Sequence, residues 1–344
     1  MDSGAIAKTL ADWIDINSIT GSEADYGDAL ARALTARGYA VEMQEVEPGR
    51  RNVLARADVP EVVFCTHIDT VPPFIPPRIA GGTVYGRGAC DAKGQALAML
   101  LAADRLVAEG ERRVGFLFTV GEEVDSAGAS FADERLADDP ALRDGWAPRY
   151  TIVGEPTGNR FVSGHKGLFL GELVAHGVAG HSSRPLGPSA VHELVGCCAK
   201  LVASPWGEAP DLGPGTINVG RISGGLAPNV VAPEARADIL VRAVEEPEVV
   251  RERVLAALGE HVELLEGREQ YGPVRFHVPE GEESEPVAFG TDAPHLTRWG
   301  TPLLIGPGSI DLAHTDEERI EVREVEEGAA RHVATVLELL QRES

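Results

Sequence analysis

The alternation of strand-like and helical segments along the first 155 residues constrains the fold of this chain more than any other feature. Ala- and Leu-rich segments with helical spacing run from 93 to 108 and from 126 to 136. Apolar, β-type runs occupy residues 39–46, 52–56, 61–67, 112–120 and 149–155. Strands that alternate with helices favour an α/β fold, with a mostly parallel sheet covered by helices on both faces.

Two helices are expected before the first strand. Ile6, Leu10 and Trp13 have the spacing of a helix with one apolar face. In the segment "SEAD", Ser22 and Asp25 have the spacing of a capping box that would start the second helix.

The order of elements changes near residue 165 and predicts an inserted domain. From "GLFLGELVAHG" onward the order is strand, helix, strand, strand, helix, strand, which is the split βαβ (ferredoxin-like) arrangement of an α+β domain. The segment after 279 has too few strands for a third domain, although its helix "APHLTRW", strand "PLLIG" and last helix could complete the first sheet. We therefore predict a discontinuous catalytic domain, 1–164 and 279–344, and an inserted dimerisation or lid domain, 165–278.

Composition excludes several classes of protein. The formal charge is 31 − 54 = −23, which repels nucleic acid and anionic lipid. No apolar stretch is long enough to span a bilayer, and the first residues do not resemble a signal peptide. The four cysteines form no C-x-x-C pair. We expect a cytoplasmic protein with reduced thiols and neither nucleic-acid nor membrane partners.

Polar residues gather where the predicted strands end. The strand at 61–66 is followed by His67 and Asp69, the strand at 114–120 by Glu122 and Glu123, and the strand at 150–154 by Glu155. The loop "GRGACDAKG" places Asp91 before a helix, and "GPGSIDLAH" contributes His314. Each residue alone would read as a cap or a solvated loop residue. Together they would crowd like charge at the carboxyl edge of one sheet, unless divalent cations neutralise it. Imidazole and carboxylate ligands without thiolate suit zinc.

The segments "THIDTVP", "GRGACDAKG", "GEE", "GEPT" and "GPGSIDLAH" occur in this order over nearly the whole chain. As a set they resemble the motifs of the zinc-dependent acetylornithine deacetylase, succinyl-diaminopimelate desuccinylase and aminoacylase family. The resemblance implies two Zn²⁺ ions, with Co²⁺ as an alternative. By it, His67 and Glu155 bind one ion, Glu123 and His314 bind the other, and Asp91 bridges them.

The resemblance also implies a reaction and a division of roles. The reaction is hydrolysis of an amide, with Glu122 taking a proton from a water held between the metals and passing it to the leaving amine. Asp69 would orient His67 by accepting its second ring N–H. If the strand continued through them, Glu122 and Glu123 would point to opposite faces, which would divide base from ligand. The peptide Asp91–Ala92 is expected to be cis.

Four further residues match positions that bind substrate in the family. They are His181 in "GHSSRP", Asn229 in "APNVVAP", Arg242 in "ILVRAV" and Gly308 in "GPGS". Without the resemblance, His181 and Arg242 would read as a turn residue and a surface ion-pair residue, and Gly308 as part of a tight turn. Relatives often form homodimers through the inserted domain, and the same is expected here.

Within the family, "GPGSIDLAH" followed by "TDEERI" resembles acetylornithine deacetylase and its relatives that act on acetylcitrulline or acetyllysine. The expected function is therefore removal of the N-acyl, preferably acetyl, group from an N-acyl amino acid, as in arginine biosynthesis. Alternatives are a hydrolase of carrier-protein-linked lysine or ornithine, a succinyl-diaminopimelate desuccinylase or a dipeptidase. A catalytically inactive binding or scaffold homologue is a further alternative, which the complete ligand set disfavours.

Overall fold

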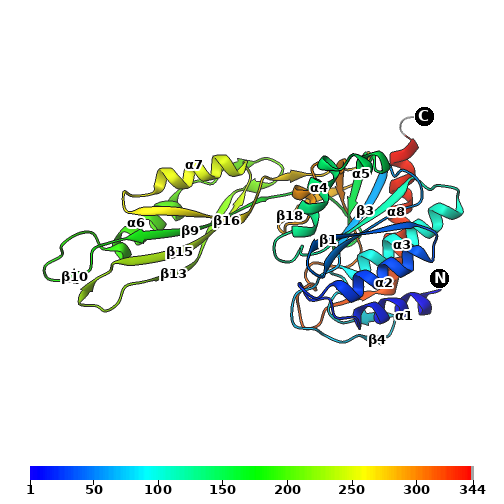
Figure 1. The fold of residues 1–344 in the computed structure, drawn as a ribbon, viewed down its shortest axis with the longest axis horizontal. Helices are drawn as coiled ribbons and strands as arrows, with labels where there is room; N and C mark the ends of the chain where they lie inside the picture. Colours follow the sequence, from blue (N-terminus) through cyan, green and yellow to red (C-terminus); the bar gives the residue numbers. More distant parts are fainter. Residues whose placement is uncertain (342–344) are drawn as a thin grey trace. The chain divides into compact units, whose positions relative to one another are not determined.

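The computed structural model describes residues 1–341, which form two compact units (Figure 1). Unit 1 comprises Met1–Ser163, Arg275–Glu285 and the chain from Thr291 onward, and unit 2 comprises Gly164–Val274 and Pro286–Gly290. The boundaries expected at 164/165 and 278/279 lie close to two of these transitions. The short return of the chain to unit 2 at Pro286–Gly290 has no counterpart in that expectation.

Unit 1 is built on a six-stranded sheet in the order β1-β2-β6-β3-β7-β19. The last four strands in this order are parallel to one another, whereas β1 and β2 are antiparallel to their neighbours. Pro48 and Gly49 alone connect β1 to β2, and such a short turn can join only antiparallel strands. The strands are β1 Ala40–Glu47, β2 Arg50–Arg56, β3 Val62–His67, β6 Val114–Thr119, β7 Tyr150–Val153 and β19 Thr301–Leu304.

Helices cover both faces of this sheet, as the continuous burial of β3 requires (Figure 1). Phe64 of β3 packs in a core with residues of α1, α2, α3 and α8, whereas Val63 and Cys65 pack with residues of α4 and α5 on the opposite face. The helices are α1 Ser3–Ile14, α2 Ala24–Thr35, α3 Lys93–Ala108, α4 Ala127–Asp138, α5 Pro140–Gly145 and α8 Val322–Gln341.

Two sequence-based predictions about helices are wrong. No capping box starts α2, because the residue at its N-cap is Glu23, whose buried carboxylate instead pairs with Arg50 at 2.7 Å. The segment "APHLTRW" forms only a single 3₁₀ turn, η1 (Ala293–His295). Beyond this turn, Asp133 of α4 accepts the Arg298 backbone N–H at 2.7 Å, so a tertiary contact takes the donor that a longer helix would have used.

Short strands form a small second sheet in unit 1 and also occur where the chain passes from one unit to the other. The strands β4 Arg78–Ala80, β5 Thr83–Tyr85 and β20 Arg319–Glu321 form a small sheet in the order β20-β5-β4. The chain passes between the two units within β8 Phe161–His165, β17 Val274–Arg275 and β18 Ser284–Val287, and a fourth time after Gly290. Among the residues described, no helix is both long and apolar enough to cross a membrane.

Unit 2 has the predicted split βαβ fold. Its four strands are antiparallel in the order β13-β15-β9-β16, and burial alternates along β15 because one face of the sheet packs on the two helices. Its main elements are β9 Gly167–His176, α6 Ala190–Ala203, β13 Thr216–Gly224, β15 Glu234–Ala243, α7 Pro247–Ala257 and β16 Val262–Tyr271. Two short antiparallel pairs are β10 Gly180–His181 with β14 Val230–Val231, and β11 Glu208–Ala209 with β12 Gly213–Pro214.

Candidate metal centre and active site

The carboxyl ends of three neighbouring parallel strands define the candidate site. The strands β6, β3 and β7 are adjacent, and they lead into the segments that carry Glu122 and Glu123, His67, and Glu155 respectively. His67 and Glu155 are almost fully buried. The carboxyl edge of a parallel sheet is where such folds deliver functional groups.

Asp91 lies between two imidazoles. Its Oδ1 is 2.8 Å from Nε2 of His67, and its Oδ2 is 3.1 Å from Nε2 of His314. The same nitrogen of His314 is 3.0 Å from the carboxylate of Glu123. One ligand atom each from His67, Asp91 and Glu123 lie within 4.8 Å of one another, a spacing that could hold a metal ion. The structure thus brings together four of the five predicted ligands at hydrogen-bonding distance.

The backbone around these ligands has unusual conformations. The peptide Asp91–Ala92 is cis, as the resemblance implies, and His314 has a φ of 62°, in the left-handed region. Gly308 has a φ of +83°, and a Cβ at this position would lie 2.7 Å from Cβ of Cys90. The glycine therefore allows the "GPGS" turn to pack directly against the loop that carries Asp91.

The contacts of Asp69 differ from the prediction. Nδ1 of His67 lies 2.9 Å from the backbone carbonyl of Asp69 and 3.4 Å from its carboxylate, so the carbonyl is the closer partner. The carboxylate accepts the backbone N–H groups of Glu122 (3.1 Å) and Glu123 (3.3 Å), and the hydroxyl of Thr20 (2.8 Å). Asp69 thus orients His67 mainly through its main chain and holds the two glutamates in place through its side chain.

Glu122 and Glu123 lie in a turn, so the expectation that they alternate along a strand is wrong. The strand β6 ends at Thr119, and Gly121 then adopts a φ of +83°. Asn52 of the neighbouring β2 fixes the base of this turn, because its side chain accepts the N–H of Val120 and donates to the carbonyl of Gly128. The different roles expected of the two carboxylates therefore depend on this turn and on its contacts with Asp69, not on alternation along a strand.

Electrostatics in this region favour a bound cation. Burial, together with the neighbouring carboxylates, raises the pKa of Glu122 and Glu155 well above the usual value. Although burial opposes it, hydrogen bonds to Asp69 and Asp91 raise the pKa of His67, and those to Asp91 and Glu123 raise the pKa of His314 to about 10. The carboxylates thus stabilise positive charge at this place, which a bound divalent cation would supply.

The donor set fits zinc. Two imidazoles and several carboxylates converge without a thiolate, since burial raises the pKa of the nearby thiols Cys65 and Cys90 well above the usual range. Glu155 shares this electrostatic environment, because the charges of His67, Asp91 and Glu123 all influence its pKa.

Sequence reasoning missed two acidic residues next to the site. Asp292, just before η1, is buried and accepts the hydroxyl of Thr119 at 2.6 Å, and its charge raises the pKa of Glu122. In sequence it reads as the start of a helix, and no local signal marks it. Glu318 is buried against the Asp91 loop, and its only signal is its position four residues after His314.

Three predicted substrate-binding residues lie in unit 2. His181 in β10 and Asn229 before β14 are exposed and close together, because β10 pairs with β14 and the N–H of Ser182 donates to the carbonyl of Asn229. Arg242 pairs with Leu168 at one end of β9. Glu234, which follows β14 closely in sequence, pairs with His176 at the other end of β9. About 26 Å of strand separates these ends, so within unit 2 the structure does not bring Arg242 to the other two.

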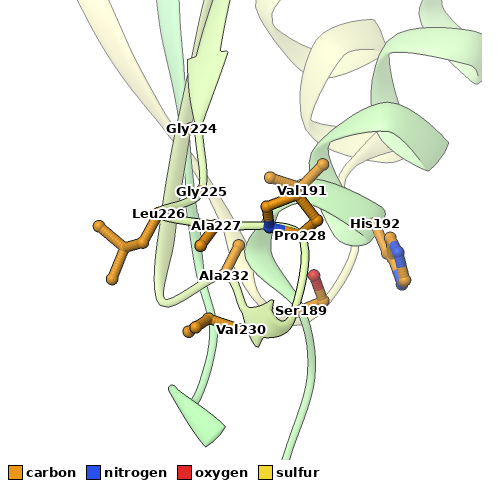
Figure 2. A pocket seen from close by; sticks show the side chains of 10 residues that line it. All are labelled: Ser189, Val191, His192, Gly224, Gly225, Leu226, Ala227, Pro228, Val230 and Ala232. Carbon is orange, nitrogen blue, oxygen red and sulfur yellow. The ribbon is translucent and has the colours of Figure 1, made fainter. Parts of the chain in front are cut away.

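A cavity of about 440 Å³ adjoins the turn that carries Asn229 (Figure 2). The start of α6 lines one side, with Ser189, Val191 and His192, and the turn after β13 lines the other, with Gly224, Leu226 and Pro228 among its residues. His192 is the one ionisable residue among those that line the cavity, so its walls present no convergent set of charged groups.

An α/β domain with a carboxylate- and imidazole-rich centre at its strand ends, interrupted by a split βαβ domain, defines a metal-dependent hydrolase. Residues 63–338 match the model of Peptidase family M20/M25/M40. The chain belongs to this family and is a metallohydrolase that acts on amide C–N bonds.

Individual relatives are similar over nearly the whole chain. A Peptidase M20 domain-containing protein of Schizosaccharomyces pombe is 37% identical over 92% of this chain and 80% of its own. A probable carboxypeptidase of Aspergillus terreus is 38% identical over 92% of this chain and 82% of its own. Among solved structures, the aminopeptidase PepT from Bacillus cereus has a TM-score of 0.81 at 20% identity, and the match covers 99% of this chain and 100% of that one.

Proposed function

We propose that this protein is a two-metal hydrolase that cleaves the amide bond before an amino acid with a free carboxylate, as a carboxypeptidase or dipeptidase does. The observation that carries the proposal is the cluster of His67, Asp91 and Glu123, with Glu122 next to Glu123 on one turn. The probable carboxypeptidase of Aspergillus terreus, 38% identical, supports the choice of substrate class.

In this proposal the ligands are divided as the resemblance to the family implies. His67 and Glu155 would hold one zinc ion, Glu123 and His314 would hold the other, and Asp91 would bridge them, which agrees with its two oxygens facing different imidazoles. Bound zinc would polarise the scissile carbonyl and lower the pKa of water.

Glu122 serves as the base in the proposed reaction. Burial and neighbouring carboxylates raise its pKa, which suits a group that accepts a proton from water and later gives it to the leaving amine. The backbone N–H of Glu122 is fixed by Asp69, so the position of the base is set before substrate binds.

Removal of an acetyl group from an N-acetyl amino acid, such as acetylornithine or acetylcitrulline, is the second candidate. It is favoured by the resemblance of "GPGSIDLAH" and the following "TDEERI" to acetylornithine deacetylases. Both candidates break an amide bond to an amino acid with a free carboxylate, which the backbone N–H groups near Gly308 are proposed to bind. They differ in the acyl side of the substrate.

We also propose that the protein is a homodimer formed through unit 2. The strand β13 is at the edge of its sheet and is mostly exposed, with Ile222 54% exposed. On α6, Val195 and Val202 are 52% and 61% exposed. A second copy would cover this edge and these apolar side chains. Sedimentation of the full chain tests the proposal, with Ile222→Lys as the variant expected to be monomeric.

The substrate proposal is tested by amine release from zinc-loaded protein. The panel contains N-acylated dipeptides, free dipeptides and tripeptides, acetylornithine, acetylcitrulline, acetyllysine and succinyl-diaminopimelate, each with a chelated control. Release from the peptides supports the first candidate, and release from acetylated amino acids alone supports the second. Metal binding without turnover of any member would reject both candidates.

The role of Glu122 is tested by Glu122→Gln. We expect this variant to bind two metal ions while kcat falls by about 10²- to 10⁴-fold, because a general base contributes on that order. Loss of metal in this variant would show that Glu122 is a ligand, and full activity would contradict the mechanism.

A further inference from the structure

Glu318 makes an unusual set of contacts for a carboxylate outside the ligand set. Its Oε1 accepts three backbone N–H groups from one loop, those of Gly88 (2.9 Å), Cys90 (3.3 Å) and Asp91 (3.3 Å). Its Oε2 accepts a hydrogen bond from the guanidinium of Arg87 at 2.6 Å. Both side chains of this ion pair are at most 2% exposed, so these contacts form in a dry environment.

The same contacts join two segments that are distant in sequence. The backbone carbonyl of Glu318 accepts the N–H of Gly86, and the guanidinium of Arg87 donates to the carbonyl of Thr315 at 3.2 Å. The first segment ends in Asp91, and the second begins with His314. Glu318 and Arg87 therefore fasten together the two segments whose side chains meet at 3.1 Å in the metal centre.

We propose that Glu318 is a positioning residue that sets metal affinity by fixing Asp91 relative to His314. The inference rests on the proposed metal site. Asp91 is expected to bridge both ions, so a shift of its loop moves a ligand that both ions share. Partners outside the ligand shell commonly change metal affinity by about 10- to 100-fold.

A pair of variants separates geometry from charge. Glu318→Asp keeps the charge but withdraws the carboxylate from the three N–H groups, whereas Glu318→Gln keeps the reach and one acceptor oxygen but removes the charge. If Glu318 acts by position, Glu318→Asp binds zinc about 10-fold or more weakly than the wild type, and more weakly than Glu318→Gln. If it acts only through its negative charge, the order of the two variants is reversed.

Asp133 provides a matched control. It is a buried carboxylate that also accepts a backbone N–H and a guanidinium, both from Arg298, but it contacts no proposed ligand. We expect Asp133→Asn to lose stability and to keep wild-type zinc affinity. An equal loss of affinity in Asp133→Asn would overturn the proposal, because any weakening of unit 1 would then suffice.

The experiment is a competition titration of zinc with a chromophoric chelator, on full-length protein whose folding is checked by circular dichroism. Wild-type affinity in Glu318→Asp overturns the proposal. If Glu318→Asp does not fold, Arg87→Lys decides, since lysine keeps the charge but cannot bond to Glu318 and Thr315 with one planar group. Weaker zinc binding supports the inference, and unchanged binding rejects it. Because the readout is metal binding, it is independent of whether the proposed substrates are cleaved.

Discussion

His332 should make the stability of unit 1 depend on pH. It lies in α8, is fully buried, and packs 5.2 Å from the ring of Phe64. Within the described residues neither ring nitrogen has a hydrogen-bond partner. Burial accordingly lowers the pKa of His332 from 6.5 to about 4, because the charged form would lose its hydration without gaining a partner.

The sign and size of the effect follow from this pKa. Between about pH 6.5 and pH 4 the unfolded chain binds a proton at His332 that the folded chain does not, so stability falls as the pH is lowered through this range. From pH 7 to pH 5 the loss from this residue amounts to about 2 kcal/mol, and it approaches a maximum of about 3 kcal/mol below pH 4.

The perturbation is His332→Leu, which has similar volume and nothing to protonate. We expect the variant to be more stable at pH 7 by about 1 kcal/mol, since two unpaired buried nitrogens are removed. Between pH 7 and pH 5 it should lose about 2 kcal/mol less stability than the wild type.

The assay is urea unfolding of both proteins at pH 7 and pH 5, in the presence of a chelator. Tryptophan fluorescence reports mainly on unit 1, which contains Trp13, Trp146 and Trp299. Titration of the metal centre affects both proteins equally and cancels in the comparison. Equal losses of stability in the wild type and in His332→Leu would refute the reasoning.

Three further predictions concern the site and its supports. Gly121→Ala should lower kcat on the order of 10- to 100-fold in a steady-state assay, since its φ is +83° and a Cβ would lie 2.8 Å from Nη2 of Arg50, displacing the turn that holds the base. Lys93→Met should lower the free energy of unfolding by about 2 kcal/mol in urea, because its ammonium bonds the carbonyls of Trp13 and Ile16, and the Ile16 carbonyl would lose this buried partner; unchanged stability would contradict this. Zinc at about 100 times its dissociation constant should raise the free energy of unfolding by about 2.7 kcal/mol over chelated protein, and no shift in the urea midpoint would argue against a metal centre.

The sequence located the strand-end residues well because their positions depend on local pattern. The apolar run before His67 predicts a strand, and parallel strands present their carboxyl ends at one edge of a sheet. The helix predicted from Lys93 to Ala108 has these bounds in the structure, which places Asp91 just before it. Predicting these features requires only the periodicity of apolar residues and the order of helices and strands along the chain.

The sequence failed where a distant partner decides the outcome. Ser22 looks like a cap, but Glu23 occupies the N-cap because Arg50 from β2 binds its carboxylate. The carboxylate of Asp69 looks like the acceptor for His67, but the backbone carbonyl of Asp69 is closer to the ring, and the carboxylate also accepts the backbone N–H of Glu122. Local spacing cannot show which of two competing partners is closer in the folded chain.

By itself, the sequence determined the class of fold, the insertion of a split βαβ unit, and the residues that converge on the candidate metal centre, since each depends on chemical type and on order along the chain. Only the tertiary structure decided how that centre is held. The carboxylates of Asp69 and Glu318 bind backbone N–H groups of loops 53 and 227 residues away in sequence. Backbone donors carry no sequence signature, so these supports become visible only when the loops are brought together.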